Sequence, residues 1–241
     1  YVELDSFVYF DASKVSNVNA LKTRIIEGLT TYSKSTDVNK FGGRFKYSKA
    51  LNIIDDIDTA ITSNITRVKI RRNLRSVLNS FEQYELCFGN QFRINQEGKN
   101  IKSTGFTIEG ENEIVYITDI PNKDNNGNLD GSGQGVISIV REDSLRNTVV
   151  VVKSAGTVDY IHGEIILTTV NITSTVKENN VIEIQAFPDS NDVVGLKDLY
   201  LDFSISNTTI NMVKDTITSG EQISGVGFKV TSSYSNGELT R

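Results

Sequence analysis

Three aspartates, Asp55, Asp56 and Asp58, stand directly after a short apolar segment. Carboxylates hold a divalent ion when they converge on it, and a metal-dependent motif of the DDxxD kind achieves this by placing them one helical turn apart. Here position 59 is Thr59, and Asp58 follows Asp56 by only two residues. Carboxylates also disfavour the negative end of a helix dipole, so the run is typical of a place where a helix has ended and side chains accept hydrogen bonds from local amides. We therefore expect a turn and cap, with a metal site as the less favoured alternative.

A polar segment at residues 122–133, NKDNNGNLDGSG, partly follows the pattern of a calcium-binding loop. The residues that fit positions one, three, five, six and nine are Asn122, Asp124, Asn126, Gly127 and Asp130. Position twelve is Gly133, where a bidentate Glu has to close the site, and two carboxylates are too few for tight calcium binding. A long polar hairpin loop is the favoured interpretation, and calcium remains the alternative.

Nucleophilic and nucleotide-binding sites have little support. The single cysteine, Cys87, has only His162 as a possible histidine partner, and nothing in the sequence brings the two together. We expect Cys87 to pack and His162, which precedes a glycine, to form the corner of a hairpin. The segment GSGQG at residues 131–135 lacks both the GxGxxG spacing and the helix that aims amides at a phosphate. The sequence therefore predicts no catalytic residue, no cofactor and no metal ligand.

The most pronounced charge feature is a run of cations between residues 67 and 75. Two interpretations remain open. The cations form a solvated strand face and the segment after it, or they form a docking surface for an acidic neighbour, because arginine forks pair well with carboxylates at interfaces. Nucleic-acid binding is less favoured because no aromatic residues that stack on bases are interleaved. Under the docking hypothesis the subunit-interface residues are Arg67, Lys69, Arg71 and Arg72.

Length and composition limit the class of protein. The 241 residues suit one large or two modest domains, and a unit of this size buries a substantial core without cross-links. The net charge of −5 argues against a general binder of nucleic acid or of anionic membranes. No apolar run approaches a membrane span, and one cysteine excludes an internal disulfide framework. Because the chain begins with YVELDS, inside an apolar–polar alternation, we expect it to be the carboxyl-terminal piece of a longer protein.

The first 80 residues are expected to form a small α+β sandwich, with helices on one face of a sheet. Residues 1–12 alternate between apolar and polar side chains, which predicts a half-buried strand. Apolar residues recur at steps of three and four over residues 18–32, and again over residues 47–54, which predicts two amphipathic helices. The alternation resumes over residues 65–72, ITRVKIRR, and predicts a second strand whose cations at positions 67, 69 and 71 point outward.

From about residue 80 the sequence changes to short β runs separated by Gly, Asn and Asp turns. The expected strands are YELCF, EIVYI, VISIV, NTVVVV, GEIILTTVNI, VIEIQAF and LYLDFSI. Such a series is typical of a β-rich sandwich or a partly open barrel. The end of the chain is rich in Gly, Ser and Thr and is expected to be a peripheral extension that becomes ordered against a neighbour. We therefore divide the chain into an α+β domain at residues 1–80, a β-rich domain at residues 81–212 and an extension at residues 213–241.

Four segments together resemble a known family. They are FGGRFKYSKALNIIDDIDTAITSNITRVKIRR, GTVDYIHGEI, PDSNDVVGLKDLYLDF and ITSGEQISG. In this order they resemble the carboxyl-terminal half of the baseplate wedge proteins of T4-like contractile-tail bacteriophages, relatives of the wider J-like baseplate family. The resemblance implies that the first 80 residues are a small ferredoxin-like α/β sandwich unit, so that the fold class is α+β with a β-rich sandwich or partly open barrel following it.

The resemblance also implies a function without catalysis. It indicates a structural protein of the virion, located in the tail baseplate and assembled in the host cytoplasm. The implied partners are a second copy in a homodimer, further copies in a ring, and other baseplate wedge proteins. No nucleic acid, membrane or small-molecule substrate is expected as a partner, and no cofactor.

Two other classes of function remain in view. A β-rich receptor- or carbohydrate-binding adhesin module of a phage tail fits the β runs and the long polar loops. Such modules usually place aromatic residues on exposed loops, whereas this chain has no Trp. A metal-dependent hydrolase has to use the aspartate cluster, and tight binding of a divalent ion is the observation that favours it.

Overall fold

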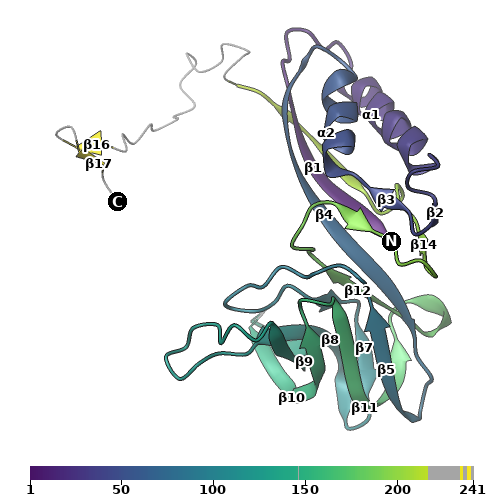
Figure 1. Cartoon of the computed structure of the whole chain (residues 1–241), viewed down its shortest axis with the longest axis vertical. Helices are drawn as coiled ribbons and strands as arrows, with labels where there is room; N and C mark the ends of the chain where they lie inside the picture. Colours follow the sequence, from purple (N-terminus) through teal and green to yellow (C-terminus); the bar gives the residue numbers. More distant parts are fainter. Residues whose placement is uncertain (146, 217–233, 236–237, 240–241) are drawn as a thin grey trace.

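The computed structural model describes residues 1–145, 147–216, 234–235 and 238–239. Strands hold 49% of the residues and helices 14%. Figure 1 shows an elongated body with two helices at one end and a group of closely spaced strands at the other. No helix in the described part of the chain combines the length and the apolar character that crossing a membrane requires.

The helical end is built on a long antiparallel ladder. Strand β1 (Val2–Phe10) pairs along its whole length with the first part of β4 (Ile61–Arg75). Between these strands the chain forms helices α1 (Val18–Ser33) and α2 (Tyr47–Asp56). The two strands and two helices predicted for this part of the sequence are therefore present.

Both helices lie on the same face of the sheet (Figure 1). Helix α1 begins after Asn17, whose side chain accepts a 3.1 Å hydrogen bond from the backbone N–H of Ala20, as an N-cap residue does. Leu21, Ile25 and Leu29 recur at four-residue steps and are buried against the sheet and α2. The apolar stripe of α1 thus supplies the core of the helical end.

Two later strands complete the sheet of the helical end. Strand β15 (Thr209–Lys214) pairs in parallel with β1, and β12 (Val181–Ala186) pairs antiparallel with the last part of β4. The resulting strand order is β15-β1-β4-β12. Because β4 continues from the helices into the β-rich end, one strand connects the two ends of the body (Figure 1).

The β-rich end is a closed barrel of seven strands. The strands in this part of the chain are β5 (Phe81–Cys87), β6 (Lys102–Ser103), β7 (Phe106–Ile108), β8 (Glu111–Pro121), β9 (Gln134–Glu142), β10 (Thr148–Asp159) and β11 (Glu164–Thr175). Ladders join β8 to β9, β9 to β10, β10 to β11, β11 to β7 and β7 back to β8, so these five strands form a closed ring of hydrogen bonds. Strand β5 pairs with β11, and β6 pairs with β8. Ile117, Ile139, Val158 and Ile165 are buried in the core.

The remaining elements of the described residues are short. They are β2 (Lys40–Phe41), β3 (Arg44–Phe45), the 3₁₀ turn η1 (Glu178–Asn180), β13 (Val193–Val194), β14 (Tyr200–Leu201), β16 (Tyr234–Ser235) and β17 (Glu238–Leu239). Strand β13 pairs with β3 and β14 pairs with β2, so residues near 200 lie beside residues near 40.

The predicted fold class, α+β with a ferredoxin-like unit and a sandwich or partly open barrel, is wrong. The chain is mostly β, and its second part is a closed barrel. The barrel closes because β7, a strand of only three residues, pairs with β8 on one side and β11 on the other. The sequence underestimated the strand content because β4, β8, β10 and β11 continue for several residues beyond the apolar runs that predicted them.

The last of the predicted strands also differs from the structure. The segment LYLDFSI forms only the two-residue strand β14, and the strand of this region that enters the main sheet is β15, which follows it.

The division into residues 1–80, 81–212 and 213–241 stays a prediction. Most of the predicted extension, at residues 217–233, 236–237 and 240–241, lies outside the described residues.

Candidate functional site

The aspartate cluster lies at the end of α2 and in the turn that leads to β4. Helix α2 continues through the first two aspartates, two residues further than we expected. Asp58 accepts a 2.9 Å hydrogen bond from the backbone N–H of Ala60 and forms an ion pair with Arg24 of α1. These two contacts lower the pKa of Asp58. Asp55 accepts a 2.7 Å bond from the side-chain amide of Asn64. The interpretation as a cap is confirmed for Asp58, which fastens the turn to α1.

The loop that partly follows the calcium pattern is the hairpin connection between β8 and β9. Asp124 Oδ1 accepts hydrogen bonds from the backbone N–H groups of Asn126 (2.8 Å) and Asn128 (2.9 Å). Asp130 Oδ1 accepts from the backbone N–H of Ser132 (2.8 Å). The predicted hairpin loop is confirmed, and both carboxylates close turns within it. Across the described residues, no three His, Cys, Asp or Glu side chains are grouped in a way that could hold a metal ion.

The side chains of His162 and Cys87 each pair with a nearby carboxylate and not with each other. His162 lies at the corner between β10 and β11, as predicted, and its Nδ1 is 2.8 Å from Asp159 Oδ2. The Cys87 thiol donates to Glu85 Oε1 at 3.4 Å. Burial and this carboxylate raise the pKa of the Cys87 thiol, so the nucleophilic thiolate is disfavoured.

Two residues of the predicted interface, Arg71 and Arg72, form contacts within their own chain. Arg71 is only 6% exposed, and its guanidinium forms ion pairs with Glu3 of β1 and, at 3.2 Å, with Glu183 of β12. Arg72 points to the other face of β4 and donates a hydrogen bond to the carbonyl of Cys87. The outward side predicted for Arg71 is therefore covered by its own chain. Their role at a subunit interface stays a prediction.

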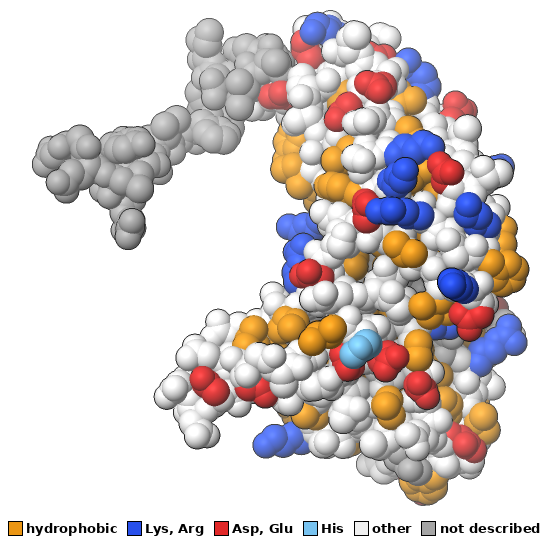
Figure 2. Space-filling view, in the orientation of Figure 1, with side chains coloured by type: hydrophobic (Ala, Val, Ile, Leu, Met, Phe, Trp, Pro, Cys, Tyr) orange, Lys and Arg blue, Asp and Glu red, His pale blue; other side chains and the backbone are white. Residues whose placement is uncertain are grey.

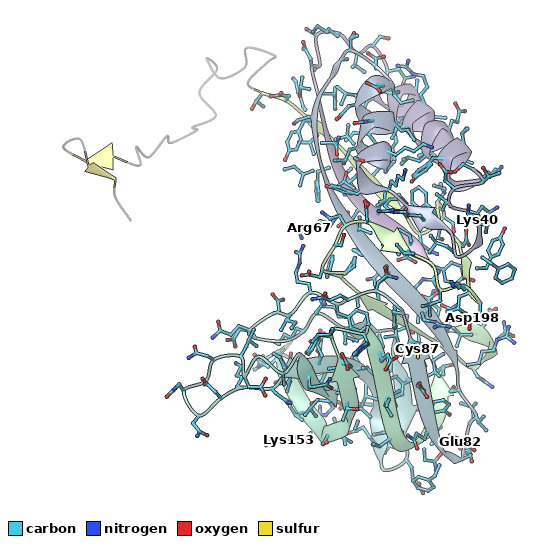
Figure 3. The ribbon with its side chains drawn as sticks, viewed as in Figure 1. Lys40, Arg67, Glu82, Cys87, Lys153 and Asp198 are labelled. Carbon is cyan, nitrogen blue, oxygen red and sulfur yellow. The ribbon has the colours of Figure 1, made fainter. Side chains whose placement is uncertain are left out.

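The other two predicted interface residues lie on the side of the sheet opposite the helices. Arg67 points away from the body in Figure 3, and Lys69 is half-buried with its Nζ 4.0 Å from Asp5 Oδ2. Strand register places Asp5 directly opposite Arg67 and Phe7 directly opposite Ile65. We call the surface formed by Asp5, Phe7, Ile65 and Arg67 the β1–β4 outer face.

The β1–β4 outer face is partly apolar. Phe7 is 39% exposed and Ile65 is 55% exposed. Figure 2 shows hydrophobic side chains gathered on the edge of the helical end that faces away from the helices. Sequence reasoning missed both residues, although a signal was present. Each occupies an outward position of its strand, where an alternating pattern calls for a polar side chain.

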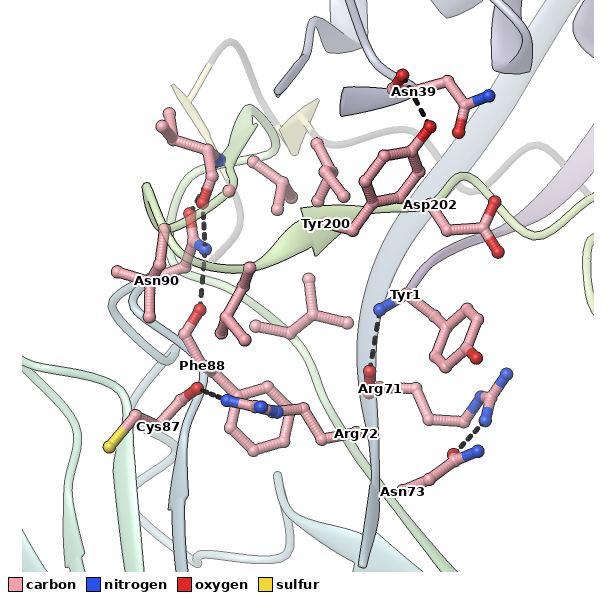
Figure 4. Close-up of a pocket in the computed structure, with 17 residues that line it drawn as sticks. Tyr1, Asn39, Arg71, Arg72, Asn73, Cys87, Phe88, Asn90, Tyr200 and Asp202 are labelled. Carbon is pink, nitrogen blue, oxygen red and sulfur yellow. Dashed lines mark hydrogen bonds between the residues drawn. The ribbon is translucent and has the colours of Figure 1, made fainter. Parts of the chain in front are cut away.

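A pocket lies where β4 passes from the helical end to the barrel (Figure 4). Its volume is about 490 Å³. Asn90 crosses its rim, where its amide donates to the carbonyls of Phe88 (3.1 Å) and Val194 (2.8 Å). Asn90 also accepts a 3.0 Å bond from the backbone N–H of Val194. Since this side chain is engaged with the backbone, the pocket wall is a structural joint between the barrel and the segment that contains β13.

Comparison with known protein families gives a match over the first part of the chain. Residues 1–73 match the family described as baseplate structural protein gp6, C-terminal domain III. The matched segment runs from β1 into β4 and so contains all four residues of the β1–β4 outer face. A search of curated proteins found no match. Over residues 1–73 the chain is thus similar to a baseplate structural protein, and this similarity supports a structural role in a phage tail baseplate, in contact with other baseplate proteins.

Proposed function

We propose that the chain is a structural component of the baseplate wedge. In this role it helps to form the ring between wedges, through self-association and through contacts with other wedge proteins. The observation that carries the proposal is the match of residues 1–73 to a domain of a baseplate structural protein. The family resemblance of segments beyond residue 73 extends the same role to the rest of the chain.

The way in which the chain holds its two ends together supports a structural role. Strand β4 belongs to the sheet of the helical end and continues to the barrel, so a force on one end is transmitted through a continuous ladder. The buried guanidinium of Arg71 bridges Glu3 on β1 and Glu183 on β12, which fixes the positions of three strands. A ring that has to survive assembly needs stiff modules of this kind.

We also propose that the chain acts without catalysis. The support comes from what the candidate groups do. Asp58 caps a turn, Asp124 and Asp130 close turns within a hairpin loop, and the pKa of Cys87 is raised and not lowered. Catalytic acids and nucleophiles instead have pKa values shifted toward their task and lie together in a cleft.

Two experiments test the proposal. Size-exclusion chromatography with light scattering on the full chain is expected to show a dimer or a larger species, and a strict monomer at high concentration contradicts self-association. Electron microscopy of phage tails made without the chain is expected to show separate wedges with no closed ring. Complete baseplates under those conditions contradict the proposed role in ring formation.

A further inference from the structure

We propose that the β1–β4 outer face is a self-association surface that binds the same face of a second copy. The two copies are related by a two-fold axis that lies between the two sheets and runs parallel to β1 and β4, above the line that separates these strands. This inference rests on the self-association in the proposed function and adds the surface, the orientation and the paired residues.

The apolar part of the surface is a cross-strand pair with no cover from the described residues. Phe7 and Ile65 are directly opposite each other in the ladder and are 39% and 55% exposed. Tyr9, two positions along β1, and Val213 of β15, which is paired with Tyr9, extend the patch and are half-buried. Large apolar side chains that lie together on a sheet face are typical of a contact surface, because their exposure to water is unfavourable.

The charged part of the surface contains an arginine without a carboxylate partner. Arg67 forms no ion pair with any described residue, although Asp5 is opposite it in the ladder. The Asp5 carboxylate is turned toward Lys69, at 4.0 Å, and Asn211, at 3.4 Å. Arg67 instead lines a groove of about 380 Å³ together with Arg93. Two guanidinium groups along one groove favour a carboxylate from a partner.

The distribution of charge identifies a second copy as the partner. The partly exposed acid of this face, Asp5, is on β1, and the base opposite it, Arg67, is on β4. A rotation by 180° about the two-fold axis between the two sheets places β1 of one copy over β4 of the other. Asp5 then faces Arg67 of the second copy. The surface is therefore complementary to itself, which a surface built for an unrelated partner has no reason to be.

The same rotation also matches the apolar residues. Phe7 of each copy faces Ile65 of the other, so the two apolar pairs form one central cluster. The strands of the two sheets stay aligned, which is one of the two favoured arrangements of sheets packed face to face. An apolar centre with charged pairs at its margin is the usual composition of a specific interface.

The orientation can be tested with two charge-reversed variants of the full chain, Asp5→Lys and Arg67→Glu, studied by sedimentation equilibrium. Each variant alone places like charges together twice in the dimer, so its dissociation constant is expected to rise by about tenfold or more. An equimolar mixture forms a heterodimer in which the lysine introduced at position 5 faces the glutamate introduced at position 67. The unchanged Arg67 and Asp5 face each other at the second contact. The mixture is expected to regain the affinity of the unchanged chain.

Controls separate this interface from other effects. Lys153→Glu makes the same change of charge as Arg67→Glu on an exposed residue of the barrel (Figure 3), and its dissociation constant is expected to stay unchanged. Ile65→Ser weakens association without altering charge. Circular dichroism checks that each variant is folded.

The outcomes distinguish the inference from the proposed function. If the unchanged chain associates and the mixture shows no recovery, another surface joins the copies, and the inference is wrong while self-association stands. If Lys153→Glu weakens association as much as Arg67→Glu, the effect is a general one of charge and the inference is equally wrong. A chain that remains monomeric at every concentration contradicts both.

Discussion

Inside the barrel the phenol of Tyr160 donates a 2.7 Å hydrogen bond to the carboxylate of Asp119, and neither side chain is exposed to solvent. The other carboxylate oxygen accepts a 2.6 Å bond from the backbone N–H of Ile101. Burial raises the pKa of Asp119 in spite of these bonds. Burial and the nearby Asp119 also raise the pKa of Tyr160. The pair joins β8 to the turn after β10, so it fixes two segments of the barrel that are distant in sequence.

Removal of the Tyr160 hydroxyl is expected to destabilise the barrel. Tyr160→Phe leaves a buried carboxylate oxygen without its donor, which lowers the free energy of unfolding by about 1–3 kcal/mol. Urea unfolding followed by circular dichroism measures the change. The matched control is Tyr200→Phe, which removes the hydroxyl of an exposed tyrosine that donates to the carbonyl of Asn39, and a loss as large as that of Tyr160→Phe contradicts the prediction.

Arg71 and Arg67 are expected to differ in their effect on stability. Arg71→Ala leaves Glu3 and Glu183 without their buried cation and lowers the free energy of unfolding by about 3–5 kcal/mol. Arg67→Ala, four residues earlier on the same strand, changes it by about 0.5 kcal/mol or less because the side chain is exposed. Equal losses in urea unfolding show that Arg71 is not the buried bridge described above.

The turn after α2 is expected to depend on one aspartate of the three. Asp58→Ala removes the acceptor for Ala60 and the partner of Arg24, and is expected to cost about 0.5–2 kcal/mol in thermal unfolding. Asp56→Ala, at the exposed end of α2, is the control and is expected to have little effect. If added Mg²⁺ raises the melting temperature of the unchanged chain but not of Asp58→Ala, the cluster binds metal and the interpretation as a cap is incomplete.

His162 is expected to titrate above its ordinary value. The hydrogen bond to Asp159 and the charge of that residue raise the pKa of His162. Burial alone raises the pKa of Asp159, but hydrogen bonds from His162 and Gln134 outweigh it and lower that pKa to about 2. Because the folded state favours protonated His162, this contribution to stability is complete below the unfolded pKa of about 6.5 and is lost as pH rises through the folded pKa.

An NMR titration of the imidazole ring measures this shift. In the variant Asp159→Asn the pKa of His162 is expected to fall back toward the value of an unperturbed histidine. An unchanged pKa in the variant shows that Asp159 does not hold the ring in solution.

Local elements of this fold could be predicted, and its closure could not. Helix α1 follows from the spacing of Leu21, Ile25 and Leu29 and from the cap at Asn17, all of which are close in sequence. The barrel closes through β7, where three residues pair with two strands, and such a short segment carries almost no periodic signal. Short-range patterns identify the strands but do not say which edges meet.

The candidate site shows the same limit at the level of single residues. Alternation in β4 correctly placed Arg67 and Arg71 on one face. It could not show that Arg71 is covered, because its partner Glu183 is 112 residues further along the chain. It also gave no weight to Ile65, whose importance depends on its register with Phe7 on another strand. Burial and interface residues are thus set by long-range pairing.

The central claim, that the chain is a structural part of a phage baseplate, is tested most directly by quantitative mass spectrometry of purified tails and isolated baseplates. The account predicts peptides of the chain in the baseplate fraction at a fixed ratio to other baseplate proteins, with cross-links between copies that involve β1 and β4. Baseplates that are complete but contain no copy of the chain contradict it.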